Sequence, residues 1–339
     1  MPGYIPASGW GYDEWNGPVC EGLLFEIPYR LYLHTGEARH LIHAIPYFDR
    51  YLKYLEYQED ENGDVTYGLD DWVAPNSEDK VGSAFINSAY RIKFLRIALL
   101  AAQLAGMDAT QYKNKLAAQI AAHTQKYMNN DGTCNIAKQT AVAMTIYHDI
   151  YEDLAPLAAQ LKQLVAEKDF HHDCGMVGLR HLYMALNKCG LPDYAYRIII
   201  AHGFPSYRNW YEDNMTTLFE EWQDNRDSSH NHHMFSDVMS WMMKTILGIQ
   251  PTNPGCSHVK IAPHFFDGLS FAKGHIDCPQ GKVSVEWQKF NEVVKMTVTV
   301  TGSLTVECSG KILRAGTNTL EMILLLKTSD YEKKGRSIL

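Results

Sequence analysis

Residues 83–127, SAFINSAYRIKFLRIALLAAQLAGMDATQYKNKLAAQIAAHTQKY, contain the clearest structural pattern in the chain. Apolar side chains recur at helical spacing from Ser83 to Ala105, and the spacing returns from Ala109 to Tyr127 after a short break. Such a period places the apolar side chains on one face of a helix. The stretch therefore predicts two helices joined by a short loop.

Helical spacing continues on both sides of this pair. Before it, Cys20–Leu33 ends close to Gly36, which is typical of a helix C-terminus, and Ala38–Tyr57 repeats the spacing, so the two segments predict a hairpin of helices. Further helices are predicted at residues 140–150, 154–166, 177–188, 192–201 and 234–247. About ten helices joined mostly by short loops favour an α/α toroid over a four-helix bundle.

The pattern changes after residues 250–256, QPTNPGC. Short alternating runs separated by turn residues follow, and they predict antiparallel β structure. These runs are Val259–Ile261, Lys282–Trp287, Val293–Val300, Leu304–Cys308 and Thr319–Ile323. We therefore expect a helical domain over residues 1–250, a β domain over 251–326 and a polar tail over 327–339.

The composition argues against several classes of protein. The chain has 339 residues, a net charge of −8 and no long basic run, so we expect no nucleic-acid partner. Seven widely spaced cysteines favour reduced thiols and a cytoplasmic location. The first residues lack the pattern of a signal peptide, and no apolar run has the length of a membrane span, so we expect no membrane partner.

The sequence TTLFEEWQDNRDSSHNHH, residues 216–233, is the strongest candidate for a functional site. It places Glu220 and Glu221 between Phe219 and Trp222. Aromatic surroundings disfavour the charged form of a carboxylate, and aromatic faces pack well against sugar rings. The stretch therefore favours a proton-transfer carboxylate in a carbohydrate cleft, with the aromatic side chains as binding surfaces. The alternative is a helix start that carries solvated acids.

Two other segments combine tryptophan with acids, GWGYDEWNGP at residues 9–18 and YGLDDW at residues 67–72. Loops on a rigid scaffold often carry function. The alternative for the first segment is a surface loop that its tryptophans anchor.

Histidines and an aspartate in two short segments leave a metal site open as a further alternative, because imidazole is a common metal ligand. Their spacing fits no standard ligand motif, so hydrogen bonding or capping is the competing interpretation, and we expect no cofactor. The residues concerned are His171, His172, Asp173, His230, His232 and His233.

Three pieces of the chain together resemble the bacterial α-L-rhamnosidases of glycoside hydrolase family seventy-eight. The first is SGWG at residues 8–11, followed by EIPYRLYLHTGE. The second lies between Gln139 and Pro205 and includes GMVGLRHLYMALNKCGLPDYAYRII. The third is TTLFEEW with SHNHH, followed by VKIAPHFFDGLSFAKGHIDCPQGKVSVEW. The resemblance implies an (α/α)6-barrel, complete or short of its first helices, followed by a small β-sandwich.

The resemblance also implies roles for single residues. The family motif of two threonines, a leucine, an aromatic residue and a glutamate falls on Thr216–Glu220, so Glu220 is the predicted general base that activates water. Phe219 stands where the family commonly has tryptophan. The other sugar contacts that the resemblance implies are Trp10, Asp71, Trp72 and His232.

The family's general acid lies in a D-C-P-x-R-x-E motif, which this sequence does not contain. Either the chain is a shortened form that a partner segment or an oligomer completes, or another acid substitutes, and the candidates are Asp13, Glu14 and Glu21. With an acid present, the predicted reaction is inverting hydrolysis of a terminal α-L-rhamnoside, with the two carboxyl groups roughly 6.5–9.5 Å apart. The alternative is a degenerate relative that binds carbohydrate without catalysis.

Overall fold

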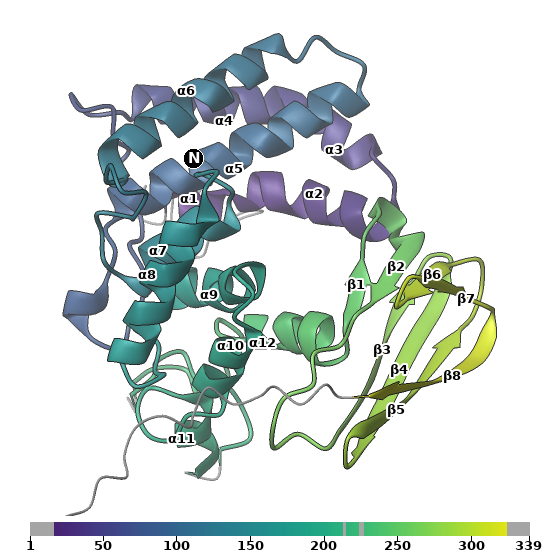
Figure 1. Ribbon diagram of the computed structural model, residues 1–339. Helices are drawn as coiled ribbons and strands as arrows, with labels where there is room; N and C mark the ends of the chain where they lie inside the picture. Colours follow the sequence, from purple (N-terminus) through teal and green to yellow (C-terminus); the bar gives the residue numbers. More distant parts are fainter. Residues whose placement is uncertain (1–16, 213–214, 224–226, 324–339) are drawn as a thin grey trace, which may run out of the picture.

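The computed structural model describes residues 17–212, 215–223 and 227–323. Up to residue 246 it consists of helices that alternate between an inner and an outer layer (Figure 1). The inner layer contains α1 Gly17–Glu21, α2 Leu23–Thr35, α5 Ser83–Leu104, α7 Gln139–Tyr147, α9 Met176–Lys188 and α12 Asp237–Trp241. The outer layer contains α3 Arg39–His43, α4 Ile45–Tyr57, α6 Thr110–Tyr127, α8 Leu154–Glu167 and α10 Pro192–Ile199.

Burial distinguishes the two layers. Successive inner helices contact one another in the order α2, α5, α7, α9 and α12. Of these, α7 is buried on almost every side, whereas the outer helix α8 buries a single stripe, Leu157, Leu161 and Val165. Large side chains join the layers, and the ring of Phe25 stacks on Phe48 of α4 with 4.3 Å between centroids. This arrangement confirms the predicted fold of helical hairpins.

The structure differs from the predicted helices in detail. The segments predicted at 20–33 and 38–57 are each interrupted, at Gly22 and at Ala44. The last predicted helix begins at Asp237 and continues beyond Trp241 as a π-helical turn, η2 Met242–Ile246. A short helix, α11 Tyr207–Glu212, was not predicted. Single-residue interruptions and helices of one to two turns leave little trace in apolar spacing.

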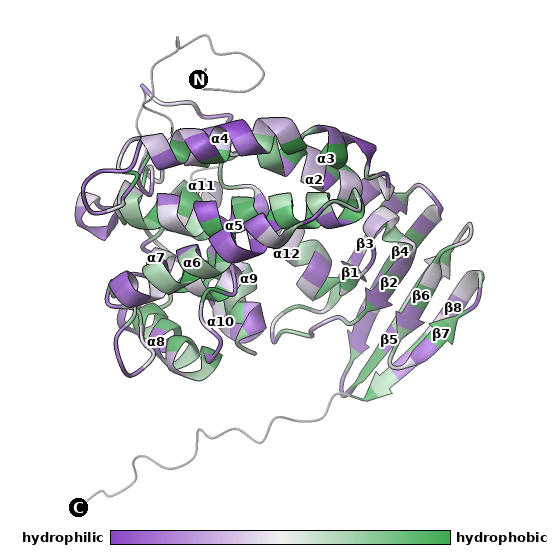
Figure 2. Ribbon diagram, turned by 90° about the horizontal axis from the view of Figure 1, so that it is seen from above, coloured by the Kyte–Doolittle hydropathy of each residue, from purple (hydrophilic) through white to green (hydrophobic). Residues whose placement is uncertain are grey.

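Two four-stranded sheets form the C-terminal part. In spatial order, one contains β1 Ile249–Pro251, β2 His258–Ile261, β6 Thr305–Cys308 and β7 Lys311–Leu313. The other contains β3 Phe271–Cys278, β4 Gly281–Phe290, β5 Val293–Val300 and β8 Gly316–Ile323. Figure 2 shows hydrophilic and hydrophobic residues alternating along these strands. The inward residues of both sheets, such as Val259, Val285 and Val298, share one apolar core, as in a β-sandwich.

One strand pair contradicts the purely antiparallel expectation. Strands β2 and β6 pair in parallel, with Val259 opposite Val306. These strands are separated by more than forty residues of sequence, and local alternation gives no information about which distant strand becomes the partner. Three strands were not predicted, because their local alternation of apolar and polar residues is weak. They are the short β1 and β7 and the partly exposed β3.

Side chains from the C-terminal part fill the junction with the helices. Phe266 lies in the core of the helical part, stacked on Tyr196 of α10 with 4.4 Å between ring centroids. The indole nitrogen of Trp287 donates to the carbonyl of Ile246 at 2.9 Å. The change from helix to strand falls between Ile246 and Ile249. The domain limits at residues 250 and 326 stay predictions, and residues 327–339 lie outside the described part.

Across the described residues, no helix is both long and apolar enough to span a bilayer.

Loops that precede the inner helices meet at one end of the helical part. Inner and outer helices alternate in direction, so α5, α7, α9 and α12 begin at the same end (Figure 1). Gln223 donates its side-chain amide to the carbonyl of Pro75 at 3.1 Å, and Lys138 and Lys168 both pair with Asp79. This end therefore brings together segments that are distant in the sequence, including residues 216–223.

Candidate functional site

Residues 216–223 and 227–233 form two facing segments between α11 and α12. The backbone N–H of Glu220 donates to the carbonyl of Ser229 at 2.8 Å, and the N–H of His232 donates to the carbonyl of Leu218 at 2.8 Å. The hydroxyl of Thr217 donates to the carbonyl of His230. These bonds bring the glutamates and the histidines of the stretch onto facing segments. No helix begins at Glu220 and Glu221, so the alternative of a helix start does not describe this loop.

Glu220 is half-buried at the middle of this loop. Its Oε2 accepts a hydrogen bond from the backbone N–H of Ser229 at 3.0 Å, and the same two residues are also joined through the N–H of Glu220. This reciprocal pair fixes the direction of the carboxylate. The second carboxylate oxygen, Oε1, is the atom that a water or ligand could use.

Phe219 and Trp222, predicted as sugar contacts, lie below the loop in an aromatic cluster. Their exposed fractions are 3% and 2%. Phe219 stacks on His230 with 4.1 Å between ring centroids, and Trp222 stacks on Trp210 with 4.5 Å. Because both faces of these rings are covered, the structure gives Phe219 and Trp222 the role of supporting the Glu220 loop.

Asp71, predicted to hold a sugar hydroxyl, is completely buried. Its carboxylate accepts hydrogen bonds from the backbone N–H groups of Gly175 and Gly178, both at 2.9 Å, and from the hydroxyl of Thr140. Burial raises the pKa of Asp71, and these three bonds act against that rise. The structure therefore corrects the prediction. Asp71 ties the loop before α5 to the starts of α7 and α9, and no position remains for a ligand.

Trp72 is the exposed member of the same motif. Its side chain is 39% exposed, and the ammonium of Lys80 lies 5.4 Å from its ring centroid. Its backbone carbonyl accepts from the N–H of Met176 at 2.9 Å, so the indole is held beside the start of α9. An exposed aromatic face next to a cation on a fixed backbone is able to pack against a sugar ring.

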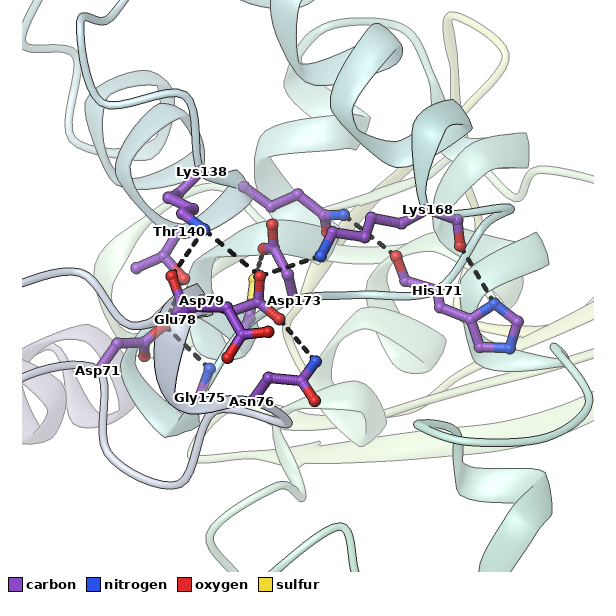
Figure 3. Close-up of polar contacts among 12 residues, drawn as sticks. Asp71, Asn76, Glu78, Asp79, Lys138, Thr140, Lys168, His171, Asp173 and Gly175 are labelled. Atoms are coloured by element: carbon purple, nitrogen blue, oxygen red, sulfur yellow. Dashed lines mark hydrogen bonds and ion pairs between the residues drawn. The ribbon is translucent and has the colours of Figure 1, made fainter.

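Sequence reasoning missed a network of two buried carboxylates and two partly exposed lysines beside these loops. Figure 3 shows the carboxylate of Asp79 between Lys138 and Lys168, with Asp173 next to it. Asp79 accepts from the ammonium of Lys168 at 3.0 Å and from Lys138 at 3.4 Å. It also accepts from the side-chain amide of Asn76 at 2.9 Å. The four members come from three loops, so no local pattern could have identified them together.

Two carboxyl groups in this network have pKa values that move apart. Burial acts to raise the pKa of Asp79, but the hydrogen bonds from Asn76 and Lys168 outweigh it, so the pKa is lowered. Burial, and then the negative charge of Asp79, raise the pKa of Asp173 to about 6. Such a split is typical of acid–base pairs. Asp173 therefore joins Glu220 as a residue whose chemistry merits testing.

The other predicted residues are Glu21, His232, Trp10, Asp13 and Glu14. Glu21 is completely buried and accepts from the hydroxyls of Tyr51 at 2.7 Å and Tyr67 at 2.9 Å, which makes it a structural carboxylate in this arrangement. His232 is half-buried, and its Nδ1 accepts from the N–H of Met234 at 3.2 Å, which leaves Nε2 for a ligand. Trp10, Asp13 and Glu14 lie outside the described residues.

The histidines of the metal alternative do not converge. The ring of His171 bonds to backbone carbonyls, including that of His202 at 2.8 Å. His172 is buried against Trp222, with 4.3 Å between ring centroids, and burial lowers its pKa to about 3. The described part of the chain contains no group of three or more His, Cys, Asp or Glu side chains placed to hold a metal ion.

Comparison with known proteins adds the following findings. The bacterial alpha-L-rhamnosidase 6 hairpin glycosidase domain matches residues 1–246, and the bacterial alpha-L-rhamnosidase C-terminal domain matches residues 248–307. An alpha-L-rhamnosidase of Streptomyces avermitilis is 29% identical over 295 residues, which are 83% of this chain and 28% of that protein.

Two solved structures resemble the chain. The Streptomyces avermitilis alpha-L-rhamnosidase complexed with L-rhamnose has a TM-score of 0.79 at 26% identity, over 89% of this chain and 32% of that one. The native rhamnosidase of Aspergillus terreus has a TM-score of 0.85 at 19% identity, over 95% and 41% of the two chains, which is a likeness of fold alone. The chain spans about a third of the length of the relatives that it matches.

Proposed function

The chain belongs to the bacterial alpha-L-rhamnosidase family, whose six-hairpin glycosidase domain matches residues 1–246, and from this membership we propose that it acts in the hydrolysis of terminal α-L-rhamnosides. The observation that supports the proposal best is the loop that presents the half-buried Glu220 where the loops of the inner helices meet. A carboxylate with one oxygen held by Ser229 and the other available has the arrangement that a general base requires.

In the proposed reaction, Oε1 of Glu220 takes a proton from a water molecule. The water oxygen attacks the anomeric carbon as the bond to the leaving oxygen breaks, and an acid on the opposite side protonates that oxygen. The configuration at the anomeric carbon is inverted. The exposed indole of Trp72 and the Nε2 of His232 are the sugar contacts that we carry forward among the described residues. Trp10 stays a prediction.

Asp173 is the proton donor that we propose to test among the described residues. A general acid must hold its proton near the working pH, and the pKa of Asp173 is raised to about 6. Asp173 follows His172, whose ring packs on Trp222, and its own carboxyl group lies beside Asp79. Asp173 is only 3% exposed, so the leaving oxygen would have to approach the small accessible part of its carboxyl group. Asp13 and Glu14 stay predictions for the same role.

The test is hydrolysis of an aryl α-L-rhamnoside by the chain, followed by proton NMR of the sugar product. We expect the β-anomer of L-rhamnose to form first and the α-anomer to accumulate later through mutarotation. First formation of the α-anomer would contradict the inverting reaction.

Absence of hydrolysis leads to a second measurement, a calorimetric titration with L-rhamnose. Saturable binding without turnover would favour the degenerate, sugar-binding relative over the hydrolase. Absence of both binding and turnover would contradict both functions for this chain.

A further inference from the structure

A cavity lies among the inner helices, away from the Glu220 loop. It has a volume of about 350 Å³ and is formed by the later turns of α2, α5 and α7 together with η2. Along α5 it begins more than two helical turns beyond Ser83, and the distance from Ser83 to Arg96 along the helix is about 20 Å. Its polar lining consists of Tyr29, Arg30, Lys93, Arg96, Tyr147, His148 and Lys244.

The charge of this cavity is opposite to that of the chain. Four lysine or arginine side chains line it and no aspartate or glutamate does, although the net charge of the protein is −8. Glu26, behind the wall, is shared between Arg30 at 3.3 Å and Lys93. One carboxylate therefore serves two of the four cations, and the cavity keeps an excess of positive charge.

Only one of these four cations, Arg96, is placed where it stabilises a helix C-terminus. Arg96 donates to the carbonyls of His148 and Asp149, at the C-terminus of α7, where a positive charge is favourable. Lys244 has no such explanation, because no carboxylate among the described residues lies within ion-pairing distance of its ammonium. It sits in the π-helical turn η2, a distortion found often at functional sites.

The cations also act on one another. Burial and then the charge of Arg30 lower the pKa of Lys244, and the negative charge of Asp237 opposes them. Burial and then the charge of Arg180 lower the pKa of Lys93, whose side chain is 11% exposed. Like charges gathered in a half-buried space raise the free energy of the empty site, and an anion would remove that cost.

Polar groups without partners complete the site. His148 is 5% exposed, and its Nε2 is buried without a hydrogen bond among the described residues. Neither the hydroxyl of Tyr29 nor that of Tyr147 has a hydrogen-bond partner within the described part of the chain. The half-buried Tyr29 and Tyr147 can therefore donate their hydroxyls to an occupant of the cavity that supplies acceptors.

We propose that this cavity binds a small tetrahedral oxyanion of the phosphate class, held by Arg30, Lys93 and Lys244, with the tyrosine hydroxyls as further donors. Its volume lies at the lower end of the range for small-molecule sites, about 300–1,000 Å³, and so accommodates a phosphate with a small organic group. The site is independent of the proposed rhamnoside hydrolysis.

The experiment is thermal unfolding of the chain with rising inorganic phosphate, with chloride adjusted to constant ionic strength. A ligand that binds only the folded state raises the melting temperature in a saturable way. We expect such a rise, and a parallel titration with glucose 6-phosphate distinguishes a site for free phosphate from one for a phosphate ester. No saturable rise with either compound would overturn the proposal.

Lys244→Met is the decisive variant, and Lys115→Met on the outer helix α6 is its matched control. Lys244→Met removes a cation that has no carboxylate partner, so we expect an equal or higher melting temperature without phosphate. The affinity for phosphate should fall by about tenfold or more, and Lys115→Met should bind like the original chain. A lower melting temperature without phosphate, with unchanged phosphate binding, would assign Lys244 a purely structural role and contradict the proposal.

Discussion

Glu220 and Asp71 show how much of a carboxylate's role can be predicted from its sequence. Both stand beside aromatic residues in motifs that resemble a glycosidase family, and both were predicted to face a sugar. Asp71 is instead surrounded by N–H groups of Gly175 and Gly178, which lie more than a hundred residues away. Hydrogen bonds from distant backbone N–H groups make this carboxylate a structural one. A local sequence motif does not show those donors.

At the residue scale, the substitution Asp173→Asn should change how the stability of the protein depends on pH. The folded pKa of about 6 exceeds the ordinary value of 3.8, so the folded state binds the proton more tightly than the unfolded state. The contribution of Asp173 to stability is therefore complete below pH 3.8 and is lost as the pH rises toward 6. At neutral pH the buried charge costs about 3 kcal/mol, which asparagine avoids.

Urea unfolding of both proteins at acidic and neutral pH provides the measurement. The variant should be the more stable protein above pH 6, and the difference should disappear toward pH 4. A difference that does not change with pH would contradict the raised pKa. Turnover of the same variant tests the donor role, because a folded variant with unchanged turnover would remove Asp173 from the mechanism.

At the scale of elements, regular segments were predictable and their connections were not. The helix predicted at 83–105 is α5, Ser83–Leu104, and the strand predicted at 293–300 is β5, because long periodic segments carry their own signal. The backbone N–H of His232 donates to the carbonyl of Leu218. Local apolar spacing does not encode this pairing, so the support given by Phe219 and Trp222 could not be predicted.

Gly178→Ala tests the close contact between α7 and α9. A Cβ atom at Gly178 would lie 1.9 Å from the hydroxyl oxygen of Thr140 and 2.8 Å from its Cβ. The helices must separate, and the bond from Thr140 to Asp71 is lost with them, so we expect a loss of about 1–3 kcal/mol in the free energy of unfolding. Urea denaturation measures it.

Gly82→Ala is the control, since Gly82 has ordinary extended backbone angles and no atom within 4 Å of the added Cβ. It should leave stability unchanged or raise it by up to about 1 kcal/mol. Equal losses in both variants would show that the contact with Thr140 is not the cause.

At the scale of the whole molecule, the helical and β parts are joined by buried side chains. The sequence shows the change of pattern near residue 250, but it does not show that Phe266 enters the helical core or that Trp287 bonds to Ile246. These contacts cross the boundary that composition suggests. The charged cavity likewise depends on the whole fold, since its four cations come from three segments, α2, α5 and η2.

Phe266→Ala tests this junction. The ring is 1% exposed and lies against Tyr196 and Trp241, so its removal should cost about 3–5 kcal/mol. We expect calorimetry to show one unfolding transition for the original chain and a separate, earlier transition of the β part in the variant. Phe271→Ala, at a position that is 65% exposed, should behave like the original chain. A single transition in Phe266→Ala at an unchanged temperature would contradict the coupling.

The central claim, that Glu220 is the general base, is tested most directly by turnover of an aryl α-L-rhamnoside in two variants, Glu220→Gln and Glu221→Gln. The two glutamates are adjacent, and only Glu220 accepts from the N–H of Ser229. We predict that Glu220→Gln lowers kcat by about 10²–10⁴-fold while Glu221→Gln retains most of it, with both variants folded. Equal turnover in Glu220→Gln and the original chain would contradict the account.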